Sequence, residues 1–389
     1  MTTSAALRPE QVIAAGICGL VLTIGLARFA YTPLLPLMHE QAGLSDSRGG
    51  LLAAINYLGY MTGTLLAAWI DDPRLRQRLY GAALWLAVAS TAAMGLTHEL
   101  WLWGVLRFAG GLCGAAGLLL GAGLVLGWLM RAGQRPELGR HLIGIGLGIV
   151  VSALGVMAFS AASLGWAAQW LGMGALGVLF LVPAWRWRPP VPPAATTATS
   201  ATPASASRRW MLAMTAAYFC AGWGFVISAT FTVAIVERQP ALAGRGPLAW
   251  LLVGLAAMPA VFAWDRVARK FGEVRALLAA FVLQTLSVAL PAASASLAAA
   301  LAGALLYGAT FIGIVSLTLA LVGRRSPANP GKAMARLTLS YGVAQVVAPA
   351  LAGAMAEASG SYRGALWLTV AVLAAGVGCV AVLLRDERA

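Results

Sequence analysis

Two arginines stand out in this sequence by their chemistry and position. Arg28 and Arg107 lie well inside long apolar stretches, where no other formally charged residue is found. Because an arginine side chain does not lose its charge, it must face water, an anion or the protein interior. Arg28 either binds an anion in a central cavity or donates to backbone carbonyls that Pro33 and Pro36 leave unpaired. We favour the first interpretation for Arg28 and a packing or coupling role for Arg107.

The acidic residues are distributed in the opposite way. None of the 13 lies deep inside an apolar stretch. A site for organic cations would normally offer a buried carboxylate, so this distribution argues against one. A negatively charged ligand is the simplest partner for the two arginines. Carboxylate, phosphate and sulfonate groups all suit the bidentate geometry of a guanidinium.

Uncharged polar residues extend this candidate site. Thr32 shares a helix face with Arg28, and Asn56 and Tyr60 lie one turn apart on another helix. The candidate substrate-binding residues are Arg28, Tyr31, Thr32, Asn56, Tyr60, Trp223, Ser228, Tyr307, Thr310, Tyr341 and Gln345. The alternative is that such residues form hydrogen bonds between helices, which contribute ~0.6 kcal/mol each on average.

The elements that position these residues are predicted from hydropathy. The chain is 60% hydrophobic and 10% charged, with a mean hydropathy of +0.82, which lies outside the range of soluble proteins. A membrane-spanning helix needs about 20 apolar residues, and continuous runs of this kind do not fit a β-barrel. We predict an all-α membrane protein with twelve transmembrane helices at 11–38, 49–70, 79–97, 100–130, 138–162, 165–184, 210–236, 247–264, 274–292, 296–322, 331–357 and 362–384.

The basic residues predict the orientation of these spans. Of the 27 lysines and arginines, 21 fall in the two tails, the central linker and the loops on the same side, whereas four fall in the opposite loops. Basic loops stay in the cytoplasm, so we expect both termini to be cytoplasmic. The positive net charge is therefore a topology signal, and no nucleic-acid partner is expected. The first span is too long for a cleaved signal peptide and lacks its basic start.

The chain is predicted to consist of two related halves. Residues 186–209 are rich in Pro, Ala, Thr and Ser, which predicts a disordered cytoplasmic linker between six-helix bundles at 1–185 and 210–389. Three pairs of local patterns recur at offsets of 197, 194 and 196 residues, beginning at Gly25 and Gly222, at Asp71 and Asp265, and at Leu164 and Gly360. A constant offset across the chain indicates a parallel duplication of the kind found in secondary transporters.

Charged turns follow the second and eighth spans. Their sequences, which begin at Asp71 and Asp265, resemble the G-x-x-x-D-R-x-x-G-R signature of the major facilitator superfamily. The second copy is the better match, because the first has Asp72 and Pro73 where the signature has an arginine followed by a variable residue. In both turns an acid is followed by Arg or Lys at the same register of the two halves. We therefore predict that Asp71 and Asp265 cap or pair with basic groups at neighbouring cytoplasmic helix ends and stabilise the outward-facing state. The residues of this cytoplasmic gate are Asp71, Arg74, Asp265, Arg266 and Arg269. The alternative is a solvated loop that only anchors topology.

Two further segments support this resemblance. The sequence from Arg107 to Gly114 is similar to the R-x-x-x-G-x-x-G motif of the superfamily, and RFAYTPLLPLM from Arg28 to Met38 is similar to the start of the bacterial YbfB/YjiJ-type subfamily. The resemblance implies a major facilitator fold of two pseudo-symmetric bundles in the bacterial inner membrane. It assigns no substrate.

These observations lead to a hypothesis with two alternatives. The leading one is a monomeric secondary transporter that moves a small organic anion by alternating access, with proton or exchange coupling. The alternatives are efflux of neutral or amphipathic compounds, with a structural Arg28, and a membrane sensor or scaffold without transport. We expect no enzymatic activity, cofactor or metal. No Gly-rich loop ends in Gly-Lys-Ser/Thr, which disfavours ATP as the energy source.

Overall fold

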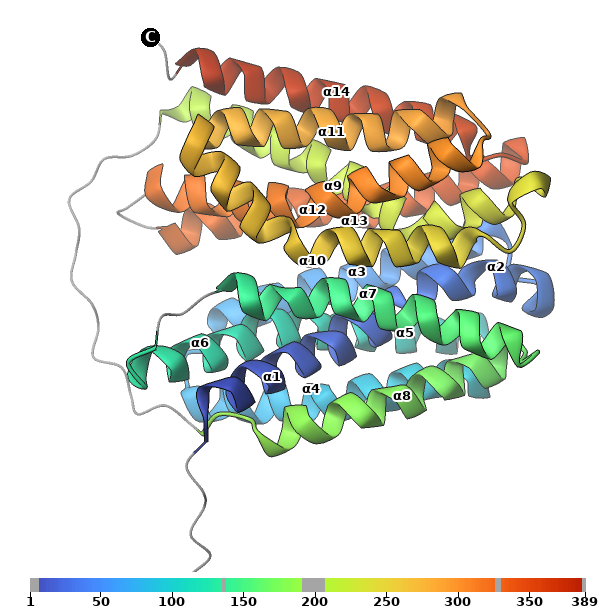
Figure 1. Ribbon diagram of the computed structural model, residues 1–389, viewed down its shortest axis with the longest axis horizontal. Coiled ribbons are helices and arrows are strands. Elements are labelled where there is room, and N and C mark those ends of the chain that lie inside the picture. The colour runs from blue at the N-terminus through green and yellow to red at the C-terminus, as the bar shows by residue number, and fades with distance from the viewer. Residues whose placement is uncertain (1–6, 135–137, 191–206, 326–329, 387–389) are drawn as a thin grey trace, which may run out of the picture. The chain divides into compact units, whose positions relative to one another are not determined.

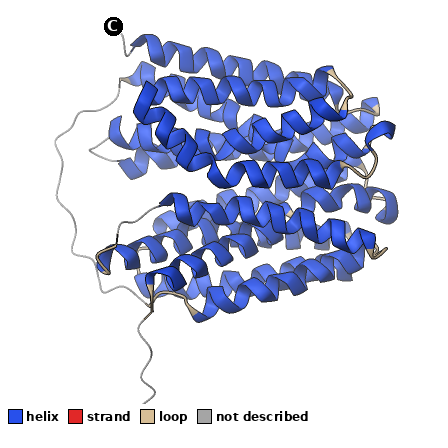
Figure 2. Ribbon diagram, in the orientation of Figure 1, coloured by secondary structure: helices blue, strands red, loops and turns tan. Residues whose placement is uncertain are grey.

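The described part of the protein is almost entirely helical. The computed structural model describes residues 7–134, 138–190, 207–325 and 330–386, and within these ranges helices are joined by short loops without any strand (Figure 2). Twelve helices are long and apolar enough to cross a membrane. The prediction of a polytopic α-helical membrane protein with six spans on each side of the linker is therefore confirmed.

The elements follow one another as a series of spans (Figure 1). In chain order they are α1 (Pro9–Leu20), η1 (Val21–Phe29), α2 (Tyr31–Ala42), α3 (Asp46–Trp69), α4 (Pro73–Ala93), η2 (Met94–Leu96), α5 (Leu100–Ala115), η3 (Ala116–Gly121), α6 (Ala122–Arg131), α7 (Leu138–Ala161), α8 (Trp166–Arg186), α9 (Arg208–Glu237), η4 (Pro240–Leu242), α10 (Gly246–Phe271), α11 (Glu273–Ala293), α12 (Leu297–Arg325), α13 (Pro330–Ser359) and α14 (Arg363–Asp386).

Two helices extend beyond their apolar stretches. α4 begins at Pro73 rather than 79, because the carboxylate of Asp72 accepts the backbone N–H of Arg74 at 2.9 Å and caps the helix. A proline at the first helical position reinforces this start. α10 continues through its charged turn to Phe271. The charged turns are therefore partly helical, which hydropathy alone does not detect.

The first span is not a uniform α-helix. It consists of α1, the π-helical segment η1 (Val21–Phe29) and α2. Pro33 cannot donate a backbone hydrogen bond, and Pro36 lies inside α2. The irregular backbone therefore lies directly before the two prolines, as the sequence predicts. π-Helical turns are rare and frequently occur at functional sites.

The chain divides into two compact units. Unit 1 comprises Met1–Tyr31 and Gly59–Thr196, and unit 2 comprises Thr32–Leu58 and Thr197–Ala389. The segment that contains α2 and the first half of α3 thus packs with the second half of the chain. The predicted boundary at the linker stays a prediction, and linker residues 191–206 lie outside the described residues.

The same helix neighbours recur in the two units. In unit 1, η1 packs on α7, α1 packs on α8, and α4 packs on both α5 and α8. In unit 2, α9 packs on α13 and α14, and α11 packs on α12 and α14. Figure 1 shows α4 beside α8 and α11 beside α14. These pairs occupy equivalent positions in the two sets of six spans, so the sequence repeat corresponds to a repeat in packing.

Glycines allow a close contact between η1 and α7 in unit 1. η1 and α7 meet at Gly25 and Gly148, where an added Cβ at Gly148 would lie 2.6 Å from the Cα of Gly25. A separation this short is not compatible with a side chain on either glycine. An added Cβ at Gly144 would likewise lie 2.8 Å from the carbonyl oxygen of Ile17, so Gly144 and Gly148 form one packing face of α7. This close contact holds η1, the segment that contains Arg28, against α7.

Candidate functional site

Arg28 lies inside unit 1 against an aromatic side chain. Arg28 is only 6% exposed and lies near the middle of the first span. The guanidinium carbon lies 4.2 Å from the ring centroid of Tyr60 on α3 and 5.4 Å from that of Phe29. A desolvated cation over an aromatic ring is stabilised by about 2 kcal/mol. The structure thus brings together Arg28 and Tyr60, two of the predicted substrate-binding residues.

Arg107 on α5 performs a backbone role. Its Nη1 donates to the carbonyls of Ala27 and Arg28 at 3.2 and 3.3 Å, and its Nη2 donates to the Arg28 carbonyl at 3.3 Å. The guanidinium carbon also lies 4.3 Å from the ring centroid of Tyr31. These carbonyls lie where η1 ends and α2 begins. Arg107 therefore stabilises the break in the first span, which is a role that the sequence suggested for Arg28.

A glycine completes the surroundings of Arg28. An added Cβ at Gly114 on α5 would lie 3.5 Å from Tyr60 Cδ2 and 3.7 Å from Arg28 Cδ, which is ordinary van der Waals contact. The R-x-x-x-G-x-x-G segment therefore contributes two residues, Arg107 and Gly114, to the surroundings of Arg28. Arg107 holds the backbone of the first span, and Gly114 lies against the side chains of Arg28 and Tyr60.

Thr32 and Asn56 belong to unit 2. The hydroxyl of Thr32 donates to the carbonyl of Ala229 on α9, and these two positions correspond to each other at the 197-residue offset of the repeat. The first and seventh spans therefore make contact at equivalent positions within unit 2. Asn56 is fully buried on α3. Both residues lie within the bundle, as the polar faces of their helices predict.

Aromatic residues form a cluster inside unit 2. Phe225 on α9 lies 5.9 Å from Tyr341 and 5.5 Å from Phe311, measured between ring centroids. Tyr307 lies 5.1 Å from Phe311, and its hydroxyl donates to the Phe225 carbonyl at 3.2 Å. Tyr57 on α3 adds an edge-to-face contact with Phe225 at 6.2 Å. Tyr307 and Tyr341 were predicted site residues, whereas Phe225, Phe311 and Tyr57 were missed because apolar rings do not stand out in an apolar helix.

The other predicted residues of unit 2 lie in different environments. The Thr310 hydroxyl is 2.8 Å from the Leu306 carbonyl and 3.1 Å from Gln284 Oε1 on α11, so it contributes to helix packing. Ser228 and Tyr307 line one small cavity of about 20 Å³ between α9, α11 and α12. Trp223 and Gln345 are buried on α9 and α13.

The charged turns are exposed. Asp265 pairs with Arg269 on its own helix α10, with 2.5 Å between Oδ2 and Nη2. The two side chains are 57% and 74% exposed, so this pair contributes at most ~0.5 kcal/mol. Asp71, Arg74 and Arg266 are also exposed, and Asp72 rather than Asp71 caps α4. The role of these residues as a gate stays a prediction.

A buried acidic residue was missed by sequence reasoning. Asp46, the first residue of α3, is 7% exposed. Its Oδ1 accepts the hydroxyl of Tyr362 at 2.7 Å, its Oδ2 pairs with Arg238, and His39 Nε2 lies 3.3 Å from Oδ1. In the sequence Asp46 stands between two spans and looks like a loop residue. Two of its partners, Arg238 and Tyr362, lie 192 and 316 residues away in the sequence, next to the ends of α9 and α14, which a linear pattern does not reveal.

A second contact joins the same helix ends. Glu357 Oε2 at the end of α13 accepts the Ser45 hydroxyl and the backbone N–H of Ser47, both at 2.8 Å. Together with Asp46, it ties the short α2–α3 connection to α9, α13 and α14 within unit 2. We call this end of unit 2, defined by Asp46, Arg238, Glu357 and Tyr362, the Asp46 end.

Comparisons with known proteins agree with the fold. Residues 20–383 match the model of a family described as uncharacterised MFS-type transporter YbfB. No curated protein matches the chain in sequence. A crystal structure of a mutant of the nucleoside transporter NupG is similar with a TM-score of 0.76 at 12% identity, covering 96% of this chain and 99% of that one.

Two other solved structures are similar over nearly their whole length. A bacterial homologue of the human lysosomal transporter Spinster, inward-facing and occupied, has a TM-score of 0.71 at 14% identity, covering 98% of each chain. The human organic anion transporter MFSD10 (TETRAN) has a TM-score of 0.66 at 17% identity, covering 96% of this chain and 100% of that one. At these identities the similarity demonstrates the major facilitator fold and not a shared substrate. All three relatives are transporters rather than enzymes.

Proposed function

Because the chain belongs to the family described as uncharacterised MFS-type transporter YbfB, we propose that it is a secondary transporter for a small organic anion. It moves the anion across the bacterial cytoplasmic membrane by alternating access, coupled to protons or to exchange. The protein acts as a monomer with both termini in the cytoplasm. The 21-to-4 asymmetry of basic residues supports this orientation.

The anion proposal rests on one observation. Arg28, in the π-helical segment η1, is buried against Tyr60. An arginine placed there costs at least ~2.5–3.5 kcal/mol on insertion scales, so a compensating function is expected. The carbonyls at the break of the first span already receive the donors of Arg107. The break in the first span therefore does not depend on Arg28 alone, and the burial of Arg28 beside Tyr60 supports a ligand-binding role.

The functional test combines transport with binding. The purified protein is screened by thermal shift against carboxylates, organic phosphates and sulfonates, with neutral amide analogues as controls. Compounds that bind are then tested for counterflow in proteoliposomes. Anions that stabilise the protein and exchange across the membrane support the proposal. Stabilisation by the neutral analogues alone would contradict it.

The Arg28 variants make this test specific. Arg28→Ala is expected to abolish the ligand-induced shift while the melting temperature without ligand stays near that of the wild type. Arg28→Lys keeps the charge but loses the bidentate geometry, so affinity falls without vanishing. A large loss of stability without ligand, combined with a normal ligand shift, would instead mean that Arg28 has a structural role.

The aromatic cluster of unit 2 favours a second candidate function. Phe225, Tyr307, Phe311 and Tyr341 offer ring faces that suit a flat neutral or amphipathic compound. In this case the protein is an efflux transporter and Arg28 is not required for binding. Phe225→Ala would then weaken binding in the same screen, whereas Arg28→Ala would leave it unchanged.

A further inference from the structure

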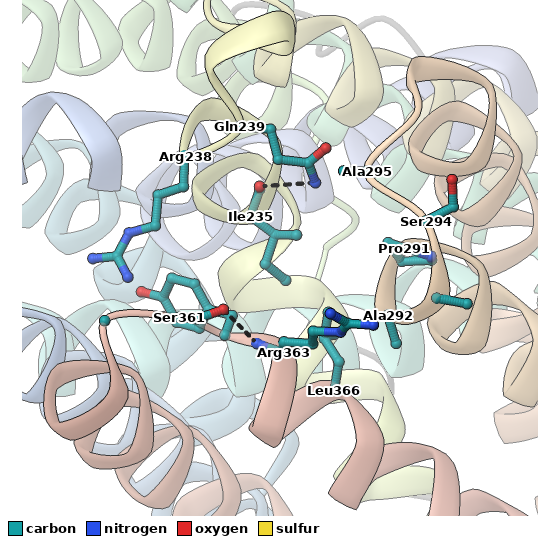
Figure 3. A pocket seen from close by; sticks show the side chains of 13 residues that line it. Ile235, Arg238, Gln239, Pro291, Ala292, Ser294, Ala295, Ser361, Arg363 and Leu366 are labelled. Atoms are coloured by element: carbon teal, nitrogen blue, oxygen red, sulfur yellow. Dashed lines mark hydrogen bonds between the residues drawn. The ribbon is translucent and has the colours of Figure 1, made fainter.

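A cavity opens at the Asp46 end of unit 2, and none of the predicted substrate-binding residues lines it. It has a volume of about 440 Å³ and lies between the ends of α9, α11 and α14. Figure 3 shows Arg363 and Ser361 below it, Pro291 and Ser294 on one side, and Gln239 above. Sites for small molecules commonly enclose 300–1,000 Å³, so the volume is sufficient for one.

The lining of the cavity is positively charged. Arg363 and Arg238 both belong to it, and among the described residues no acidic side chain lines it. In the described part of the chain no carboxylate forms an ion pair with Arg363. Arg363 is also the first residue of α14, a 24-residue helix whose N-terminal end carries partial positive charge. The electrostatic complement of this cavity is an anion.

Arg238 links the cavity to the buried carboxylate of Asp46. It lines the cavity and pairs through Nη2 with Asp46 Oδ2. Its guanidinium also lies 4.7 Å from the ring centroid of Tyr362, which donates to Asp46 Oδ1. An anion in the cavity therefore offers Arg238 an alternative to Asp46. The two acceptors compete for one guanidinium.

We propose that this cavity is a second anion-binding site, in which Arg363 holds a carboxylate or phosphate group and Arg238 is shared with Asp46. Bidentate pairing with a guanidinium selects such a group over a neutral one. Because binding at two coupled positions is reciprocal, an anion in the cavity weakens the Arg238–Asp46 contact at the Asp46 end. The proposal does not depend on the ligand of Arg28.

The test measures protection of a cysteine in the cavity. Ser294→Cys is placed in full-length protein whose four native cysteines are replaced by serine, and its reaction with N-ethylmaleimide is followed. Benzoate is expected to slow the reaction, whereas benzamide and an equal concentration of sodium chloride do not. The same protection is expected when Arg28→Ala is added, which separates this site from the proposed transport site.

Two arginine variants test whether the charge of Arg363 is responsible for the protection by benzoate. With Arg363→Gln, the benzoate concentration for half-protection rises about tenfold, because a charge-assisted hydrogen bond is lost. Arg245→Gln removes an exposed arginine that does not line the cavity and leaves protection unchanged. Asp46→Asn removes the competitor of the anion, so half-protection is reached at a lower benzoate concentration. Equal protection in wild type and Arg363→Gln would overturn the proposal.

The source of the anionic group is distinguished in nanodiscs. If phosphatidylglycerol slows the labelling of Ser294→Cys relative to phosphatidylcholine alone, and Arg363→Gln removes the difference, the site binds a lipid phosphate. If benzoate slows it in phosphatidylcholine, the site accepts a soluble anion. Labelling that responds to neither benzoate nor phosphatidylglycerol would mean that the cavity binds no anion.

Discussion

The two buried arginines illustrate how residues of the same type obtain different roles. Both are more than nine-tenths buried in unit 1. Arg107 directs its donors at two backbone carbonyls of the first span, whereas the Arg28 guanidinium lies over the Tyr60 ring. The two guanidinium groups therefore meet different atoms, although their burial and charge are alike.

Arg107→Ala is expected to destabilise the protein. It leaves the carbonyls of Ala27 and Arg28 without their Arg107 donors, at a cost of ~1–3 kcal/mol for each unsatisfied group. Thermal denaturation in detergent measures this as a lower melting temperature. Arg28→Ala serves as the control and should change stability much less. If the two variants lost equal stability, the separation of roles would be incorrect.

At the scale of elements, the first span depends on its neighbour α7. η1 and α7 meet at Gly25 and Gly148 with no space for a side chain. The equivalent pair in unit 2 is α9 with α13, where an added Cβ at Gly222 would lie 2.6 Å from the carbonyl oxygen of Tyr341. Close glycine packing at both positions holds the first and seventh spans, which carry Arg28 and Phe225.

A branched residue at the η1–α7 contact should therefore be poorly tolerated. Gly148→Val is expected to cost ~1–3 kcal/mol or more, because overpacking shifts the backbone. Gly123→Ala on α6 is the matched control, since an added Cβ there meets nothing within 4 Å. Thermal denaturation of both variants in detergent measures the difference. A Gly148→Val protein as stable as Gly123→Ala would contradict the packing assigned to η1.

At the scale of the whole molecule, the chain is a multi-pass membrane protein with the fold of the major facilitator transporters. Each unit repeats the helix neighbours of the other. The two units do not simply divide the chain at the linker, because residues 32–58 pack within unit 2. The contacts of Asp46 and Glu357 account for this, since both tie the α2–α3 connection to later helices.

The orientation of the spans can be tested directly. A cysteine at Ser205 in the linker should be protected from an impermeant thiol reagent on intact cells, and one at Gly244 between α9 and α10 should react. The physical reason is the retention of basic loops in the cytoplasm. Permeabilised cells provide the control, because both positions should then react. Labelling of Ser205 but not Gly244 on intact cells would reverse the proposed orientation.

The sequence by itself determined the number and type of the spans. Hydropathy over about 20 residues depends only on local composition, so the twelve helices and the break near Pro33 could be predicted. The 197-residue offset likewise predicted the repeat, which appears in the contact of Thr32 with Ala229. The proximity of Arg28 to Tyr60 was consistent with the polar faces of two helices.

Tertiary structure decided the partners of individual side chains. Arg107 donates to carbonyls of the first span, Thr310 faces Gln284 on α11, and the carboxylate of Asp46 meets Tyr362 and Arg238. Each of these contacts joins different helices, and the helical period states which face a residue occupies but not which helix lies opposite. A hydrogen bond forms only when the donor–acceptor distance is within a few tenths of an ångström of its preferred value. Such partners can therefore be identified only from the packed bundle.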